Sequence, residues 1–229
     1  MEGIVHERIE DLGMQKIRLP LGTPASDPHV PIFADADLKT KDRVVVIFGE
    51  TVQDLGLAAG RVANGPGGIN KGSMVSVIKE LRRSAQGDQT TGPGIVLANM
   101  GQLFWWPEGK RGLTMMARVA IPMSSLVQYG VRHVPSLNDV PQNEGPERHV
   151  QHMFGEVLPA LVGEKARLDI IAIGDSCDIV QRFLNEDENW SVWGPRLSSM
   201  VVLDTIFPEE SIKNESFKSF LAKVGISLI

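Results

Sequence analysis

The fold is decided by three runs: Arg43-Val-Val-Val-Ile-Phe48, Gly94-Ile-Val-Leu-Ala-Asn99 and Leu168-Asp-Ile-Ile-Ala-Ile173. Each run is short and rich in apolar and β-branched residues, as is typical of a strand buried on both faces of a parallel sheet. A fourth run of this kind extends from Leu197 to Leu203. We expect these four strands to be adjacent and parallel, with their carboxyl ends at one edge of the sheet.

Helical patterns separate these strands. We predict helices at 71–83, from Pro146 onward, at 177–185 and around 217–221. Proline suits the first turn of a helix because the amide proton it lacks would have no partner there. Alternating strands and helices predict an α/β fold, with a doubly wound, mostly parallel sheet in a three-layer sandwich.

The remaining segments complete one predicted domain over residues 1–229. Short strands are predicted at 14–19 and 29–33, and a last strand at 224–229. The stretch 101–145 holds several prolines and is too long for a simple connection, so it is predicted to be a lid or binding loop.

Composition narrows the class of protein. The net charge of -5 and the shortness of basic clusters such as Lys110-Arg111 argue against direct nucleic-acid binding. A single cysteine, Cys177, excludes an intrachain disulfide and a cysteine zinc site. The N-terminus lacks an apolar signal core, and no apolar run is long enough to span a bilayer. We therefore expect a cytoplasmic or nuclear protein without a membrane segment.

Four motifs carry a resemblance to a known family: 43–51, 65–73, 103–111 and 168–175. Together they resemble the fungal argonaute-binding-protein-two-like domain, over about residues 4–203. That family is similar to α/β-hydrolases in fold, and it includes the C-terminal domain of a fungal class II histone deacetylase and a subunit of an RNA-interference chaperone complex. The resemblance implies an intracellular fungal setting related to chromatin or RNA silencing.

Two departures from the family pattern concern the site. Relatives tend to carry glycine where this chain has Ser176, and they continue past the last strand into a histidine-bearing segment, whereas this chain stops at Ile229. The resemblance therefore implies a C-terminally shortened member that has kept or regained a hydroxyl group.

Ser176 follows the strand 168–173, where an α/β-hydrolase carries its nucleophile in a G-x-S-x-G turn. The local sequence Gly174-Asp-Ser-Cys-Asp178 has aspartate in place of the second glycine. Two interpretations stay open at this point. Ser176 is either a nucleophile or a helix cap whose hydroxyl accepts an amide hydrogen bond from the first turn.

Other groups would have to converge on Ser176 for catalysis. The loop Gly49-Glu50-Thr51 is expected to supply one oxyanion amide, and Cys177 the other. Asp204 ends a strand and is the candidate acid, with a loop or capping role as the alternative. Asp175 and Glu50 are further candidate bases.

The histidine is the missing member, because none follows His152 and the order serine, acid, histidine cannot be met. His133, in the long loop, is the best candidate base. His149 and His152 lie on the helix before the serine strand, and a 100° step per residue places His152 opposite the apolar face, so we expect it to be exposed.

Trp105 and Trp106, followed by Lys110 and Arg111, could form a binding surface or could pin the loop to the core. The pair His149 and His152 lacks a third ligand, so we expect no metal, and nothing in the sequence points to a cofactor.

Two functions follow as hypotheses. The first is a hydrolase-like domain without a complete triad, which binds a protein partner or a small molecule at the strand-end edge, with a homodimer as a further option. The second is a small-molecule enzyme, a hydrolase or acyl-transfer or related activity, that uses Ser176.

Overall fold

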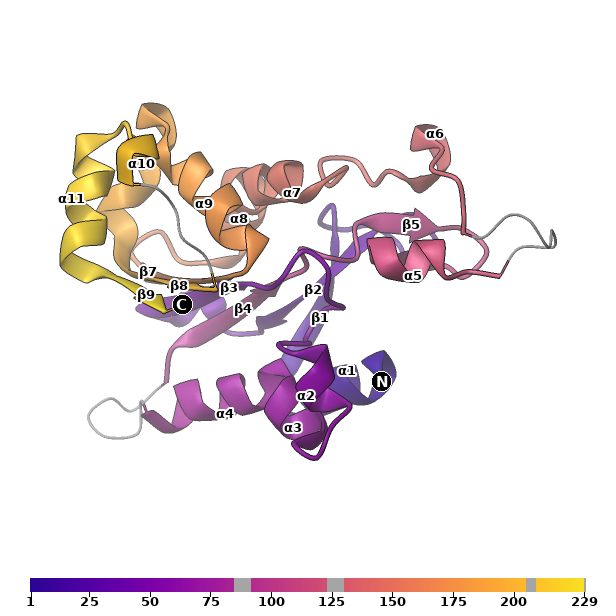
Figure 1. Cartoon of the computed structure of the whole chain (residues 1–229). Coiled ribbons are helices and arrows are strands. Elements are labelled where there is room, and N and C mark those ends of the chain that lie inside the picture. The colour runs from indigo at the N-terminus through magenta and orange to yellow at the C-terminus, as the bar shows by residue number, and fades with distance from the viewer. Residues whose placement is uncertain (85–91, 123–129, 205–208, 229) are drawn as a thin grey trace.

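A seven-stranded sheet forms the centre of the molecule, in the order β1-β2-β4-β3-β7-β8-β9 (Figure 1). The computed structural model describes residues 1–84, 92–122, 130–204 and 209–228. The strands of the sheet are β1 (Met14–Leu19), β2 (Val30–Asp35), β3 (Arg43–Phe48), β4 (Gly94–Ala98), β7 (Arg167–Ile173), β8 (Leu197–Leu203) and β9 (Gly225–Leu228).

The four strands predicted from the apolar runs are adjacent and parallel, as expected. Strand β3 pairs in parallel with β4 on one side and β7 on the other, and β7 pairs in parallel with β8. In this register Phe48 lies opposite both Ala98 and Ala172, and Ile173 lies opposite Leu203. Their carboxyl ends therefore meet at one edge, while β1 and β2 add an antiparallel flank.

Helices cover both faces of the sheet and confirm the three-layer, doubly wound α/β architecture (Figure 1). Helices α1 to α4 lie on one face, and α7 to α11 lie on the other. The helices are α1 (Glu2–Asp11), α2 (Gly60–Ala63), α3 (Gly68–Gly72), α4 (Met74–Ser84), α5 (Met115–Val119), α6 (Pro135–Asn138), α7 (Pro146–His152), α8 (Leu158–Leu161), α9 (Asp175–Asn185), α10 (Asp187–Trp193) and α11 (Glu215–Val224).

The central strand β3 contributes side chains to two separate hydrophobic cores, because successive side chains of a strand point to opposite faces of the sheet. Val44, Val46 and Phe48 belong to the larger core, under α7 to α11. Val45 and Ile47 belong to the smaller core, with residues of α1 and α4. A strand buried on both sides explains why the run 43–48 is apolar without alternation.

Several predicted boundaries differ in the structure. The helix predicted at 71–83 is split at Ser73 into α3 and α4, and α9 begins at Asp175 instead of residue 177. The stretch 101–145 is less irregular than expected, since it contains α5, α6 and a hairpin of β5 (Phe104–Trp106) and β6 (Arg111–Leu113). Residues 123–129 of this stretch, and Ile229 of the last predicted strand, lie outside the described residues.

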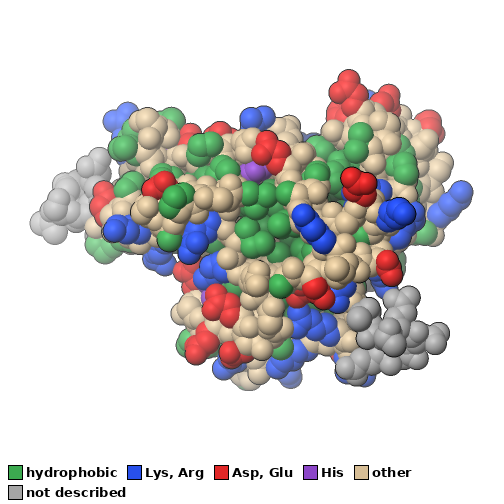
Figure 2. Space-filling view, turned by 180° about the vertical axis from the view of Figure 1, so that it is seen from behind, with side chains coloured by type: hydrophobic (Ala, Val, Ile, Leu, Met, Phe, Trp, Pro, Cys, Tyr) green, Lys and Arg blue, Asp and Glu red, His purple; other side chains and the backbone are tan. Residues whose placement is uncertain are grey.

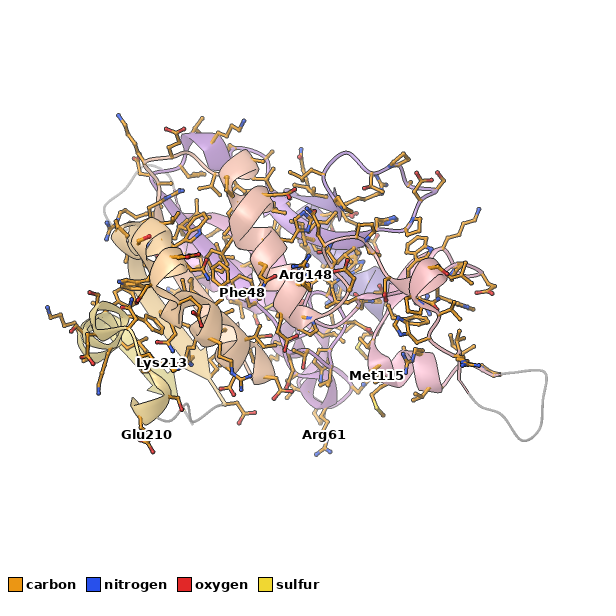
Figure 3. All side chains as sticks on the ribbon, turned by 90° about the horizontal axis from the view of Figure 1, so that it is seen from above. Phe48, Arg61, Met115, Arg148, Glu210 and Lys213 are labelled. Atoms are coloured by element: carbon orange, nitrogen blue, oxygen red, sulfur yellow. The ribbon has the colours of Figure 1, made fainter. Side chains whose placement is uncertain are left out.

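The helix predicted from Pro146 has a π-helical segment, Met153–Val157, between α7 and α8. Figure 3 looks down on this helix, with Arg148 marking α7. A π turn takes up more residues than an α turn, so a wheel drawn at a constant 100° step misplaces side chains along it. Pro159 lies in the first turn of α8, where a proline fits a helix.

The surface carries charges of both signs. On the face opposite to that of Figure 1, acidic and basic side chains are interspersed around a group of hydrophobic ones (Figure 2). Within the described residues, no helix combines the length and the apolar character that crossing a membrane requires.

Phe48 offers a test of the larger core. Its ring is fully buried and stacks on that of Phe154, with 5.7 Å between the centroids. We expect Phe48→Ala to lower the free energy of unfolding by about 3–5 kcal/mol, because it leaves a cavity in a packed core. Urea denaturation measures this, with the exposed Val52→Ala as the control, which should change stability by less than about 0.5 kcal/mol.

Candidate functional site

The carboxyl ends of the four parallel strands bring four short segments to one edge of the sheet. Gly49 follows β3, Asn99 follows β4, Gly174 follows β7 and Asp204 follows β8. Two contacts tie these ends together: the Gly174 amide donates to the Leu203 carbonyl at 2.9 Å, and the Thr51 hydroxyl donates to Asp175 Oδ2 at 3.3 Å. This is the edge at which open α/β sheets bind ligands.

The sharp turn from β7 into α9 is made at Gly174, whose φ is 59° and ψ is -134°. Such a left-handed, strained backbone between strand and helix is the feature that exposes the nucleophile in an α/β-hydrolase elbow. Judged by backbone geometry, the elbow residue is therefore Gly174, and Ser176 lies two residues further on, within the first turn of α9. Small residues at 172 and 176 flank Gly174, as such a crowded turn requires.

The side chain of Glu50 fills the space in front of Gly174. A Cβ placed on Gly174 would lie 2.8 Å from Glu50 Cδ and closer still to its carboxylate oxygen Oε1. The pKa of Glu50 is raised by burial first, and then by the nearby carboxylates of Asp175 and Asp204. A carboxylate thus stands where a hydrolase would carry its nucleophilic side chain.

Ser176 is fully buried, and its hydroxyl donates to the Gly49 carbonyl at 2.5 Å. This bond joins the end of β3 to the first turn of α9. The N-cap of α9 is Gly174, so Ser176 does not occupy the capping position either. Among the described residues, no hydrogen bond connects Ser176 with a histidine.

The amide of Cys177, expected to help form an oxyanion hole, donates to the Gly174 carbonyl at 3.0 Å within the helix. The Cys177 thiol is buried and donates to the Leu203 carbonyl at 3.4 Å. Burial raises the pKa of this thiol to about 11, so at neutral pH it is protonated and unreactive.

His149 and His152 form a buried cluster with Asn143. Asn143 Oδ1 accepts from Nδ1 of His149 at 2.7 Å and from Nδ1 of His152 at 3.1 Å. The expectation that His152 is exposed was wrong: the residue is 4% exposed. The loop residue Asn143 contacts the side of the helix that the constant step assigned to solvent. The Nε2 atoms of both rings are buried and have no hydrogen-bond partner among the described residues.

His133, the candidate base from the long loop, pairs with Asp139, with 2.5 Å between Nε2 and Oδ1. Its ring also lies 5.9 Å from that of Phe104. Its partner is therefore a carboxylate within the loop, and both residues line a cavity beside the strand-end edge.

The tryptophans of the hairpin have different environments. Trp105 is 3% exposed and packs beside His29, and its carbonyl accepts from Asn138 at 2.9 Å. Trp106 lies against Arg111, 5.9 Å from its guanidinium carbon. Lys110 takes a positive φ of 49° in the tight turn between β5 and β6.

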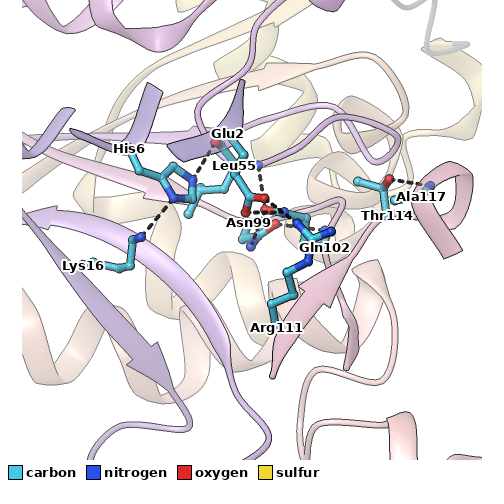
Figure 4. Close-up of polar contacts among 9 residues, drawn as sticks. All are labelled: Glu2, His6, Lys16, Leu55, Asn99, Gln102, Arg111, Thr114 and Ala117. Atoms are coloured by element: carbon cyan, nitrogen blue, oxygen red, sulfur yellow. Dashed lines mark hydrogen bonds and ion pairs between the residues drawn. The ribbon is translucent and has the colours of Figure 1, made fainter. Parts of the chain in front are cut away.

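A polar network attaches the hairpin to the N-terminal helix (Figure 4). Glu2 accepts from Arg111 at 3.0 Å and from the Gln102 amide at 2.8 Å, and Gln102 Oε1 accepts from the Leu55 amide at 2.9 Å. The sequence missed α1 and this network, because ion pairs between residues 109 positions apart leave no local pattern.

The long loop and the sheet edge enclose a cavity of about 290 Å³, which we call the lid cavity. Figure 3 shows Met115, one of its lining residues, on a helix to the side of the sheet. The lining residues are Thr51, Met100, Gly101, Leu103, Phe104, Leu113, Met115, Arg118, His133, Asp139, Glu144, Gly145 and Pro146. The lining is thus mainly apolar, with a few polar groups, as is usual for small-molecule sites.

Arg118 is the cation of the lid cavity. Its guanidinium carbon lies 5.2 Å from the centre of the Phe104 ring, and its Nε is buried with no hydrogen-bond partner in the described part of the chain. The cavity's two carboxylates have other partners, because Asp139 pairs with His133 and Glu144 lies 3.7 Å from Arg148. No carboxylate among the described residues pairs with Arg118.

Among the residues that the structure describes, no group of three or more His, Cys, Asp or Glu side chains could hold a metal ion.

The comparison with known families agrees with the fold and with the resemblance of the four motifs. The family model of the Arb2 domain matches residues 1–227. The chain belongs to the Arb2 domain family. No curated protein matches this Arb2 domain.

The buried imidazole of His149 makes the stability of this Arb2 domain dependent on pH. Burial, and then the neighbouring His152, lower the pKa of His149 from 6.5 to about 3. The stabilisation from keeping this ring neutral is complete above pH 6.5 and is lost as the pH falls from 6.5 toward 3. We expect the stability advantage of wild type over His149→Gln to shrink by several kcal/mol across that range, measured by urea denaturation.

The half-exposed His133 provides the matched control. His133→Gln should keep the wild-type loss of stability below pH 6.5. An unchanged difference between wild type and His149→Gln from pH 7 to pH 4 would contradict the assignment.

A double-mutant cycle tests whether Glu50 occupies the elbow. Gly174→Ala should lower the free energy of unfolding by about 1–3 kcal/mol from backbone strain alone, and by more while Glu50 stands in the way. In the Glu50→Ala background the additional cost should vanish, giving a measurable coupling. Gly155→Ala, where a Cβ has open space, is the control. Strict additivity of the Gly174 and Glu50 changes would show that Glu50 does not hold this position.

Proposed function

We propose that this Arb2 domain is a non-hydrolytic α/β-hydrolase-like domain that binds a small molecule in the lid cavity, without forming an acyl-enzyme. One observation carries the proposal: the elbow residue is Gly174, and the Glu50 carboxylate fills the position of a nucleophile. A hydrolase needs an activated nucleophile at that point, together with amides directed at a developing oxyanion.

The state of Ser176 supports the same proposal. Its proton is directed to the Gly49 carbonyl, so the hydroxyl would have to rotate and become exposed before it could react. A buried hydroxyl in a 2.5 Å bond to a backbone oxygen stabilises the junction of β3 and α9. In this proposal Ser176 has a structural role, and the candidate acid Asp204 contributes to the negative charge near Glu50.

The lid cavity indicates the chemistry of the ligand. Arg118 offers a guanidinium without a carboxylate partner among the described residues, beside the aromatic ring of Phe104 and the apolar Leu103 and Leu113. A planar apolar molecule with a carboxylate satisfies both features, because guanidinium groups bind carboxylates in a two-pronged geometry.

The setting implied by the family remains part of the proposal. We place the domain in the cytoplasm or nucleus of a fungal cell, in work related to chromatin or RNA silencing. A protein partner at the same edge is the other occupant that this setting allows.

The second candidate function is a small-molecule enzyme acting through Ser176. One observation favours it: the His133–Asp139 pair is an imidazole oriented by a carboxylate on the wall of the same cavity as Thr51.

Covalent labelling separates the two functions. We expect a fluorophosphonate probe to leave the wild-type protein unlabelled, and Ser176→Ala to cost about 0.5–1.5 kcal/mol of stability from the lost hydrogen bond. Calorimetry with 2-naphthoate should show saturable binding, weaker for the uncharged 2-naphthamide and for Arg118→Met.

Labelling that depends on Ser176 would overturn the proposal in favour of the enzyme. Equal affinity for naphthoate and naphthamide would show that Arg118 does not recognise the carboxylate. If neither compound bound, the lid cavity would not be the ligand site. Arg83→Met, which changes an exposed arginine on α4 that does not line this cavity, is the matched control and should bind naphthoate as wild type does.

A further inference from the structure

A second cavity, which shares no lining residue with the lid cavity, lies at the other end of the sheet under α11. Its volume is about 520 Å³. Strands β8 and β9, helices α9 and α11 and residue Ile212 enclose it, near the segment marked by Lys213 in Figure 3. The lining residues are Gln181, Met200, Val202, Ile212, Glu215, Lys218, Ser219, Leu221, Ala222, Gly225 and Ile226. We call it the α11 cavity.

Gln181, in helix α9, is a buried polar residue in the lining of the α11 cavity. The other residues of α9 buried on its sheet-facing side from the second turn onward, Val180 and Leu184, are apolar. Gln181 is only 3% exposed, yet its Nε2 is buried and has no hydrogen-bond partner among the residues that the structure describes. Leaving a buried amide without a partner costs about 1–3 kcal/mol. An apolar residue of similar length would avoid that cost, so a partner from outside the chain explains glutamine here.

The other lining residues indicate the chemical groups of that partner. Met200, Val202, Ile212 and Leu221 present flexible or branched aliphatic groups, and none of the described lining residues is aromatic. The volume lies in the range of small-molecule sites. The two charged lining residues, Glu215 and Lys218, have opposite signs, so the lining favours a neutral ligand over an ion of either sign.

We propose that the α11 cavity binds an aliphatic molecule with a neutral carbonyl oxygen, which accepts a hydrogen bond from Gln181. The carbonyl lies at the buried end, beside Gln181 and Met200. The aliphatic chain extends past Leu221 toward the exposed Ile226. The site is independent of the lid cavity and of the function proposed there.

Binding of 2-nonanone to the full chain tests this site. Calorimetry or saturation-transfer NMR should show saturable binding to wild type. Gln181→Met keeps the length of the side chain and removes the donor, so the affinity should fall several-fold to about tenfold, the effect of one hydrogen bond. Ala222→Trp, at an exposed lining position, should block the cavity and abolish binding while the protein remains folded.

A matched control is Gln151→Met, which changes an exposed glutamine on α7 and should bind 2-nonanone as wild type does. Circular dichroism confirms that each variant is folded. Absence of saturable binding to wild type would overturn the proposal. So would equal affinity of wild type and Gln181→Met, because water or solvent would then satisfy the amide.

Discussion

At the end of β7 the chain reverses through the left-handed backbone of Gly174, and the arrangement of the whole strand-end edge depends on that turn. Since α9 begins one residue later, its first amides and side chains are drawn against the ends of neighbouring strands. The Gly174 amide reaches the Leu203 carbonyl of β8, and the Ser176 hydroxyl reaches the Gly49 carbonyl after β3. Only glycine holds this conformation without strain, and here it also leaves the space that Glu50 fills.

The same turn determines which chemistry the edge supports. Glu50, Asp175 and Asp204 are close enough for the last two to raise the pKa of the first. Acyl transfer instead requires a positive electrostatic potential at the reacting carbonyl, with hydrogen-bond donors directed at the oxyanion as negative charge develops. A group of carboxylates opposes that charge. The Cys177 amide, which would stabilise an oxyanion formed at Ser176, already donates to the Gly174 carbonyl. The edge therefore combines the backbone shape of a hydrolase elbow with a group of acidic side chains.

The parts of the fold that depend on local pattern could be predicted from the sequence. A strand such as 43–48, buried on both faces, must be continuously apolar, so the pattern gave its position and its parallel partners. The position of the candidate site could be predicted only to within about one turn of the chain. Ser176 was placed at the right junction, but the elbow lies at Gly174, because a glycine in a motif does not reveal the sign of its φ. His152 was misplaced for another reason: it precedes the π turn, and the loop residue Asn143 contacts its ring, a tertiary contact that helical periodicity cannot show.

Contacts between distant residues determine the rest. The hairpin of β5 and β6 is attached to α1 through Gln102 and Arg111, which both donate to Glu2, and to α6 through Asn138, whose side chain donates to the Trp105 carbonyl. These bonds hold the described part of the long loop in place. A cavity wall that is already ordered loses less conformational entropy on binding than a loop that must first fold. Under the proposed function such a wall would serve recognition through preformed contacts, with Arg118 beside the Phe104 ring as the group that binds the carboxylate.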